Sequence, residues 1–282
     1  MPADAGRQAA VLGHPVAHSL SPVLHLAAYA ELGLAWTYER IDVTSEGLAA
    51  FVSGLDDTWA GLSLTMPLKQ AVLPLLAEVD DVVLATGAAN TVVLRDGRRL
   101  GRNTDVEGIA ASLDERSVGH ETSGGDRSAV VLGAGATARS AVAALARRGT
   151  TSVTAYVRRP DAADDLRSTA AACGVALEVR GWHEARAGLG ADVVVSTVPR
   201  GAADLLADGV TDRPGTLLDV VYDPWPTPLA TAWSARGGAV ASGLDLLLHQ
   251  AVRQVELMTG MTPTLAVLRD ALESAARSRR PV

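Results

Sequence analysis

Lys69 is the residue of this chain whose type and position most clearly predict chemistry. Lysine and arginine total 25, and Lys69 is the only lysine among them. It stands in Thr65-Met66-Pro67-Leu68-Lys69, where Pro67 favours the start of a helix. A cation in the first helical turn faces the positive end of the helix dipole, so the lysine pKa should fall below its usual value of about 10.4. The stretch predicts a proton donor and acceptor, with a solvated charge as the alternative.

Two further polar segments also stand next to predicted elements. Asp105 ends Gly101-Arg102-Asn103-Thr104-Asp105 at a helix start, where Asp105 or Thr104 could serve chemistry or only cap the helix. Asn90 ends Gly87-Ala88-Ala89-Asn90 before a strand, where it could bind a ligand or accommodate a turn. The chain has only two asparagines, Asn90 and Asn103. A composition that avoids lysine and asparagine favours a function for those that remain.

Ser19 and Ser21 are separated by one residue, so their hydroxyls face the same way in an extended segment. Together they could hold one carboxylate, although Ser21 precedes Pro22 and could instead cap a helix. Gln250, in a predicted helix, is either a buried polar residue or a ligand donor. The six histidines show no metal-ligand spacing, and Cys173 is the only cysteine. We therefore expect no metal site and no internal disulfide.

The stretch Gly133-Ala134-Gly135-Ala136-Thr137-Ala138 has the spacing of a dinucleotide-binding loop. It follows the apolar run 129–132 and precedes an alanine-rich helical segment. The first glycine allows a tight turn, the second lets the backbone approach a pyrophosphate, and the small third residue lets helix and strand pack closely. Amides at the helix start would bind the phosphates. A plain tight turn is the alternative.

Arg158 and Arg159 end the next predicted strand, where an NAD site usually offers an acidic residue to the ribose. Two arginines suit the 2′-phosphate of NADP instead. A solvated basic turn is the other interpretation. The sequence thus predicts NADP(H) as the cofactor.

The pattern of apolar runs predicts the elements that position these residues. In the first half we expect strands at 9–12, 36–43 and 61–64, helices over 22–32 and from Pro67 to about Leu76, and a hairpin of 91–94 with 98–100 around Asp96-Gly97. In the second half we expect strands at 129–132, 152–157, 175–179, 192–196 and 217–221, helices at 105–116, 244–258 and 263–277, and a loop at 117–127. Alternating strands and helices predict an α/β protein with mainly parallel sheets, the second one doubly wound.

Composition excludes several classes of protein. The chain has 282 residues, of which 48% are hydrophobic and 20% charged, as in soluble globular proteins. A net charge of -7 argues against nucleic acid as a partner. No apolar run approaches the roughly 18 residues of a membrane span, and no signal peptide opens the chain. A cytoplasmic enzyme that does not bind membranes is expected.

Taken together, these motifs make the chain resemble the shikimate dehydrogenase family over most of its length. Seven segments follow the order found in the family: Gly13-His14-Pro15 with His18 to Pro22, Thr65 to Lys69, Gly87 to Thr91, Gly101 to Asp105, the Gly133 loop, Asp219 to Tyr222, and Gly243 to Gln250. Departures from the family pattern occur at Leu26, Ser63, Val157, Leu246 and 195–199.

The resemblance implies a reversible NADPH-dependent reduction of 3-dehydroshikimate to shikimate, a step of chorismate and aromatic amino acid biosynthesis. It implies an α/β substrate domain at 1–105, a doubly wound (Rossmann) NADP-binding domain at 106–239, and C-terminal helices at 240–282 that return to the substrate domain. The partners would be small molecules, with the chain a monomer or a homodimer. The resemblance also implies roles for single residues. Ser19 and Ser21 would bind the carboxylate, Lys69 and Asp105 would act on the reacting oxygen, and the ring hydroxyls would contact Thr65, Asn90 and Gln250. Tyr222 would lie beside the substrate and Gly243 near the nicotinamide.

Two alternatives stay open at this point. One is a quinate or quinate/shikimate dehydrogenase that uses NAD; Ser21, where quinate-selective relatives often carry threonine, and the two arginines argue against it. The other is a non-catalytic relative that binds NADPH or a shikimate-like ligand, against which the presence of Lys69 and Asp105 argues.

Overall fold

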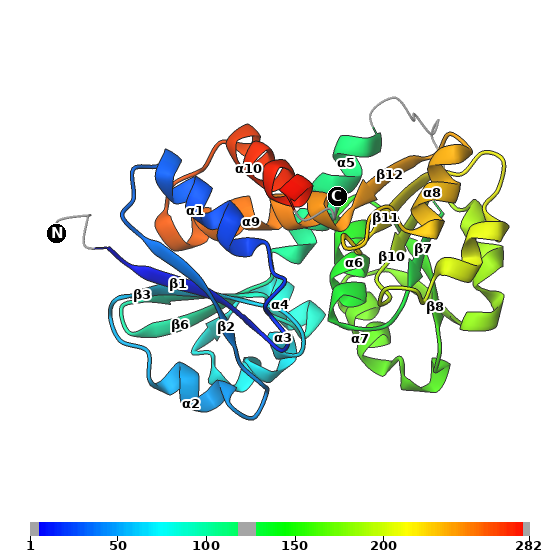
Figure 1. The fold of residues 1–282 in the computed structure, drawn as a ribbon. Coiled ribbons are helices and arrows are strands. Elements are labelled where there is room, and N and C mark those ends of the chain that lie inside the picture. The colour runs from blue at the N-terminus through cyan, green and yellow to red at the C-terminus, as the bar shows by residue number, and fades with distance from the viewer. Residues whose placement is uncertain (1–5, 118–127, 279–282) are drawn as a thin grey trace. The chain divides into compact units, whose positions relative to one another are not determined.

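A computed structural model of the chain describes residues 6–117 and 128–278, which form two compact units (Figure 1). Unit 1 combines Met1–Thr104 with Leu247–Val282, and unit 2 is Asp105–Leu246. The loop predicted at 117–127 lies, apart from its first residue, outside the described residues. No helix in the described part of the chain has the length and apolar character needed to cross a membrane.

Unit 1 is built on a mixed sheet of six strands in the order β2-β1-β3-β5-β6-β4. Strand β1 pairs in parallel with both β2 and β3, β5 is antiparallel to β3 and β6, and β4 is parallel to β6. The strands are β1 (Gln8–Gly13), β2 (Thr37–Asp42), β3 (Trp59–Leu64), β4 (Glu78–Val79), β5 (Thr91–Arg95) and β6 (Arg98–Arg102). The predicted hairpin is confirmed: Asp96 and Gly97 have φ of 52° and 68°, as a two-residue type I′ turn requires.

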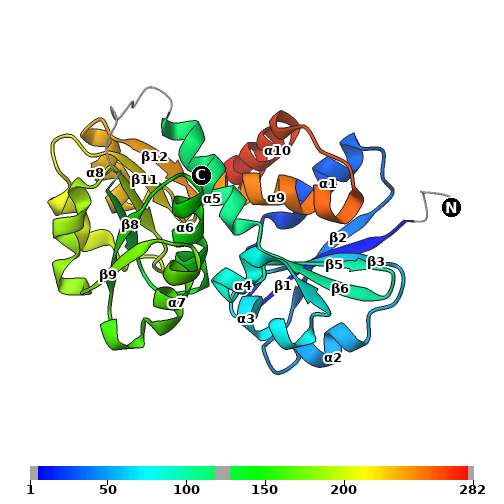
Figure 2. The ribbon, with the colours of Figure 1, turned by 180° about the vertical axis from the view of Figure 1, so that it is seen from behind.

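Helices cover both faces of this sheet. They are α1 (Ser21–Glu31), α2 (Leu48–Ser53), α3 (Leu68–Ala71), α4 (Asp81–Thr86), α10 (Leu265–Ser278) and most of α9 (Gly243–Thr259), with a 3-10 turn η1 (Leu73–Leu75). Figures 1 and 2 show α1, α9 and α10 on one face and α2 on the other. On the α2 face, Leu48, Val52 and Leu68 pack with buried strand residues such as Leu12 and Leu62.

The helix predicted from Pro67 to about Leu76 is wrong in its length. The structure has the four-residue helix α3, capped by Pro67, followed by η1 with Pro74 in its first positions. Pro74 has no amide hydrogen to donate, and its ring clashes with the carbonyl four residues earlier, so an α-helix cannot continue through it. Lys69 therefore lies in a single helical turn.

Unit 2 contains a six-stranded sheet in the order β12-β11-β10-β7-β8-β9, and every pair is parallel. The strands are β7 (Ala129–Leu132), β8 (Ser152–Val157), β9 (Ala176–Gly181), β10 (Val193–Ser196), β11 (Thr216–Asp219) and β12 (Ala239–Ser242). Strands β7, β10 and β11 are buried along their whole length, as expected of a parallel sheet covered on both faces. The strand order reverses between β7 and β10, so the predicted doubly wound sheet is confirmed.

Different helices cover the two faces of the unit 2 sheet (Figure 2). Helix α6 packs between α5 and α7, and α5 also packs on β11 and β12. On the other side, α8 and two 3-10 segments bury Leu189, Leu206 and Trp233 against strand residues such as Leu132 and Leu217. The helical elements are α5 (Asp105–Ser117), α6 (Ala136–Arg147), α7 (Asp164–Ala172), α8 (Pro228–Ala235), η2 (Pro160–Ala162), η3 (Trp182–Gly190) and η4 (Asp204–Gly209).

Candidate active site

The glycine loop follows β7 and leads directly into α6. Gly133 has φ +113°, and a Cβ atom there would lie 2.6 Å from Oγ1 of Thr197, so only glycine fits. Gly135 is the N-cap residue of α6, and no side chain caps the helix there. No heavy atom lies within 4 Å of the position that a Cβ on Gly135 would occupy. The loop thus offers open space in front of the amides of a helix start, which fits the pyrophosphate of a dinucleotide.

The other residues predicted to bind the cofactor lie around the same sheet. Ala134, Ala136 and Thr137 complete the loop and the first turn of α6, and Ala138 is fully buried, as close packing of helix on strand requires. Arg158 and Arg159 follow the end of β8, the strand that pairs with β7, and both side chains are exposed to solvent. Their exposure is compatible with binding of a phosphate, and their role stays a prediction.

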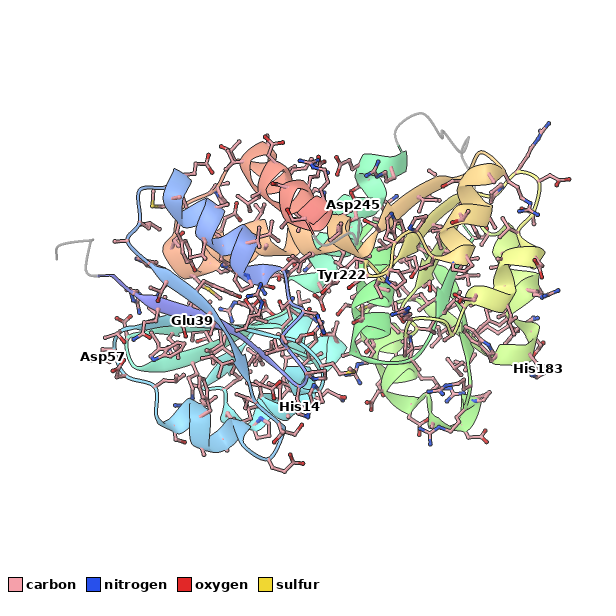
Figure 3. The ribbon with its side chains drawn as sticks, viewed as in Figure 1. His14, Glu39, Asp57, His183, Tyr222 and Asp245 are labelled. Atoms are coloured by element: carbon pink, nitrogen blue, oxygen red, sulfur yellow. The ribbon has the colours of Figure 1, made fainter. Side chains whose placement is uncertain are left out.

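Gly243 and Tyr222 lie next to each other in unit 2. A Cβ on Gly243 would lie 2.1 Å from the carbonyl oxygen of Val220 and 3.1 Å from Cδ1 of Tyr222, so only glycine allows this approach. The carboxylate of Asp219 accepts hydrogen bonds from Thr227 Oγ1 at 2.8 Å and the Val221 amide at 3.3 Å. Burial raises the pKa of Asp219, although these bonds oppose the shift. Hydrogen bonds therefore join the two ends of the segment 219–227, which carries Tyr222 (Figure 3).

A capping box begins the helix that follows. Asp245 Oδ2 accepts hydrogen bonds from the amide and the hydroxyl of Ser242 at 2.7 and 2.8 Å, and Ser242 Oγ in turn accepts from the Leu244 amide at 3.2 Å. The other oxygen of Asp245 accepts from Arg116 of α5 at 2.8 Å. Burial alone would raise the pKa of Asp245, but the bonds with Ser242 and Arg116 outweigh it and lower the pKa. Gly243 is thus fixed at the start of α9.

Asn90 is the centre of a polar cluster in unit 1. It is 2% exposed and precedes β5. Its Oδ1 accepts from the Thr104 amide and from Thr91 Oγ1, both at 2.8 Å. Its Nδ2 donates to Thr104 Oγ1 at 3.0 Å and to Gln250 Oε1 at 3.2 Å. Asn90 is not among the residues with positive φ, and its side chain bonds residues of two distant segments, which favours a role in this cluster.

Lys69 is joined to this cluster through the main chain. Its carbonyl oxygen accepts a hydrogen bond from the Ala89 amide at 2.8 Å, next to Asn90. Thr65, which follows β3, donates its amide to Leu12 at 2.9 Å. Because α3 is only one turn long, its dipole is small, and the argument from a helix start does not apply to Lys69. Asp105 is buried, begins α5 and directly follows Thr104, the partner of Asn90.

The hydroxyls of Ser19 and Ser21 lie close together, although the segment is not extended as predicted, because Leu20 between them has φ -95° and ψ -1°. Ser19 Oγ donates to Ser21 Oγ at 3.2 Å and accepts from the Ser21 amide at the same distance. Ser21 is the first residue of α1, whose N-cap residue is Leu20, and it is the Ser19 hydroxyl that accepts the first amide of the helix. The alternative role of Ser21 as a helix cap is therefore wrong.

Four buried residues near the Asn90 cluster were not among the predicted site residues: His25, Tyr38, Ser63 and Gln254. Gln254 is 1% exposed, and its Nε2 donates to the Asn90 carbonyl at 3.3 Å and to Thr91 Oγ1 at 3.0 Å. The only sequence signal for it is its spacing of four residues from Gln250, which puts both on one side of a helix.

Comparison with known proteins agrees with this geometry. A family model described as the shikimate dehydrogenase substrate binding domain matches residues 11–92, and one described as the shikimate 5'-dehydrogenase C-terminal domain matches residues 243–273. Shikimate dehydrogenase (NADP(+)) of Moorella thermoacetica is 37% identical, over 94% of this chain and 92% of that protein. The chain belongs to the shikimate dehydrogenase family.

Solved structures match the chain over nearly its whole length. The crystal structure of Mycobacterium tuberculosis shikimate dehydrogenase has 41% identity and a TM-score of 0.85, covering 95% of this chain and 99% of that one. Quinate dehydrogenase from Corynebacterium glutamicum, solved in complex with NAD, has 29% identity and a TM-score of 0.85, covering 95% and 99% of the two chains. The fold is therefore common to enzymes named for different substrates, and the site residues must decide specificity.

Proposed function

We propose that this protein is an NADP-dependent shikimate dehydrogenase, which reversibly reduces 3-dehydroshikimate to shikimate in the biosynthesis of chorismate and aromatic amino acids. One observation carries the proposal. The chain is similar along 94% of its length to an enzyme of that name. Its single lysine, Lys69, accepts a hydrogen bond at its carbonyl oxygen from the amide of Ala89, which precedes Asn90. Lys69 and the cluster that would recognise hydroxyls thus lie in unit 1, and Asp105 directly follows Thr104 of that cluster.

Reduction of a carbonyl needs a hydride on carbon and a proton on oxygen. The Gly133 loop would hold NADPH, which would supply the hydride when bound. Lys69 donates the proton to the carbonyl oxygen and accepts it again when shikimate is oxidised. In the direction of oxidation, Asp105 accepts a hydrogen bond from the reacting hydroxyl of shikimate and orients it. In this assignment Lys69 and Asp105 are the catalytic residues.

The substrate is a carboxylate that also bears ring hydroxyls, and the residues of unit 1 suit both. Ser19 and Ser21 donate their hydroxyls to the carboxylate. Thr65, Asn90 and Gln250 bind the ring hydroxyls, a role that suits side chains able both to donate and to accept. Tyr222 completes the substrate contacts.

The cofactor residues follow from the glycine loop. The pyrophosphate would be held by Gly133, Ala134, Gly135, Ala136 and Thr137, and Gly243 would lie near the nicotinamide. Arg158 and Arg159 bind the 2′-phosphate that distinguishes NADP from NAD, because a guanidinium pairs well with phosphate.

We further propose the setting in which this reaction takes place. The protein acts in the cytoplasm on small molecules, without nucleic acid as a partner, as a monomer or a homodimer. The substrate domain is 1–105, the cofactor domain 106–239, and the helices of 240–282 return to the substrate domain.

The proposal is tested by measuring kcat/KM for shikimate and for quinate, each with NADP and with NAD. We expect shikimate with NADP to give the highest value of the four. A higher value for quinate with NAD would replace the proposed function by a quinate dehydrogenase. Thermal stabilisation by shikimate or NADPH without turnover of either substrate would make the protein a non-catalytic relative.

A further inference from the structure

His25 is a fully buried histidine that the proposed reaction does not use. It lies on α1, and its ring stacks on Tyr38 of β2, with centroids 3.9 Å apart and planes 19° from parallel. Its Nε2 lies 3.2 Å from Gln254 Oε1, and its Nδ1 lies 3.4 Å from the Tyr29 hydroxyl. A buried imidazole with two polar contacts has a defined orientation, so its role can be read from its partners.

The main chain of Asn90 determines which way the Gln254 amide faces. A backbone carbonyl can only accept hydrogen bonds, and the Asn90 carbonyl lies 3.3 Å from the amide nitrogen of Gln254. Gln254 therefore presents Nε2 to Asn90 and Oε1 to His25. Because Oε1 can only accept, His25 must carry its proton on Nε2. These contacts therefore place a proton on Nε2.

Burial keeps this imidazole neutral. Loss of solvation lowers the pKa of His25 to about 3, despite the hydrogen bond with Gln254 that raises it. His25 therefore remains a single-proton donor at neutral pH, and Tyr29 can donate its hydroxyl to the free lone pair on Nδ1.

Ser63 supplies a second donor to the same oxygen. Ser63 Oγ donates to Gln254 Oε1 at 2.8 Å and accepts from the Tyr38 hydroxyl at 2.6 Å. A chain of hydrogen bonds thus runs from Tyr38 through Ser63 and Gln254 to the Asn90 carbonyl.

From Gln254 the chain of donors continues to the other proposed ligands. Gln254 Nε2 donates to Thr91 Oγ1 at 3.0 Å, and Thr91 donates to Asn90 Oδ1 at 2.8 Å. Asn90 Nδ2 then donates to Gln250 at 3.2 Å, and Gln250 donates to the Leu247 carbonyl at 3.1 Å. Each amide has one allowed orientation, because every chain of bonds ends on a backbone group that cannot reverse its role.

We propose that His25 is a positioning residue for substrate binding, which as the Nε2–H tautomer holds the Gln254 amide against Asn90 and so fixes the groups that meet the ring hydroxyls. The proposal rests on the proposed function for its substrate. It assigns His25 no contact with substrate and no proton transfer.

His25→Phe tests the role, because phenylalanine keeps the stack on Tyr38 and removes the Nε2–H donor. A neutral buried hydrogen bond contributes about 0.5–1.5 kcal/mol. We therefore expect KM for shikimate to rise about 2- to 12-fold, with kcat and KM for NADP changed by less than about twofold. Tyr29→Phe is the matched control: it removes the long contact on the other ring nitrogen and leaves Gln254 in place, so KM should stay within about twofold.

A fall in melting temperature of His25→Phe without any change of KM would make His25 purely structural and overturn the proposal. Nitrogen-15 NMR of the imidazoles in the unmodified protein gives a readout that does not depend on turnover. We expect the signal lost in His25→Phe to belong to a neutral ring protonated at Nε2 between about pH 5 and 8. A ring protonated at Nδ1 would overturn the proposal. If the wild-type protein does not oxidise shikimate, the proposed function fails while the assigned tautomer can still be tested.

Discussion

Two substitutions in the glycine loop should affect different properties: Gly135→Ala should weaken NADPH binding, and Gly133→Ala should lower the stability of the fold. Gly135 has φ -75° and ψ -173°, a conformation open to any residue, and its Cβ position is free of contacts within 4 Å. Replacing glycine by alanine at such a position stabilises by about 0.4–1 kcal/mol through the unfolded chain. Alanine is also a poorer N-cap than glycine, which offsets this gain. We expect the free energy of unfolding of Gly135→Ala to stay within about 1 kcal/mol of the wild type.

Binding of NADPH should respond very differently. If the pyrophosphate lies against Gly135, an added methyl group displaces it from the amides at the start of α6. Each lost charged hydrogen bond costs about 1.5–3 kcal/mol, which raises Kd for NADPH about 10- to 150-fold. Gly135→Val, with a larger side chain, should weaken binding further. Gly133→Ala is the contrasting variant: its φ of +113° and the overlap with Thr197 should destabilise the fold by about 1–3 kcal/mol.

Titration of NADPH by calorimetry, together with denaturant unfolding of each variant, measures both quantities. A folded Gly135→Ala that keeps the wild-type Kd would show that the pyrophosphate does not lie at this loop. A Gly135→Ala that unfolds more easily than Gly133→Ala would refute the reasoning from free space and backbone angles.

Two further predictions concern charges in unit 2. The double variant Arg158→Ala, Arg159→Ala should weaken NADPH binding by about 1.5–3 kcal/mol per lost charged contact and leave NADH binding unchanged. Unchanged NADPH affinity in a calorimetric titration would make both arginines simple solvated charges. Asp245→Ala removes the bonds to Ser242 and the ion pair with half-exposed Arg116. We expect a loss of about 2 kcal/mol at pH 7 by denaturant unfolding, mostly from the cap, because exposed pairs contribute little. Since the pKa of Asp245 is lowered in the folded state, its contribution is complete above the unfolded value of about 3.9 and disappears as pH falls through the folded value. An equal loss at pH 7 and in acid would contradict the role of its charge.

The sequence predicts best those elements that need a particular residue type. The hairpin between β5 and β6 is specified by Asp96-Gly97, and the turn after β7 by Gly133, because few other residues adopt their positive φ. The buried strands of unit 2 appear as short apolar runs. These features depend on local geometry, which neighbouring residues reveal.

Elements without such local signals were missed or misjudged. Strand β4 has only two residues, too few for any periodicity, and β12 reads Ala-Val-Ala-Ser, with alanines that disfavour strands. The helix predicted through Leu76 ignored Pro74. Each error reflects a short segment whose structure depends on pairing with distant strands or on one overlooked residue.

The hydrogen-bonded cluster of unit 1 could be predicted only in part. Asn90 and Gln250 stand in motifs that suggest ligands. His25, Tyr38 and Ser63 come from α1, β2 and β3. The register of β1 with its two parallel neighbours brings β2 and β3 together, and α1 packs on β2. No spacing along the chain encodes such a meeting, so tertiary structure was needed to find it.

The rate of NADP reduction by shikimate, compared between the wild type and Lys69→Ala, tests the central claim most directly. The account predicts turnover by the wild type and a kcat about 10²- to 10⁴-fold lower in the variant, the usual contribution of general acid–base catalysis. Thermal unfolding of the variant provides the control for its folding. A folded Lys69→Ala with near-normal kcat would contradict the account. The chain has no other lysine that could replace Lys69 as the proton donor.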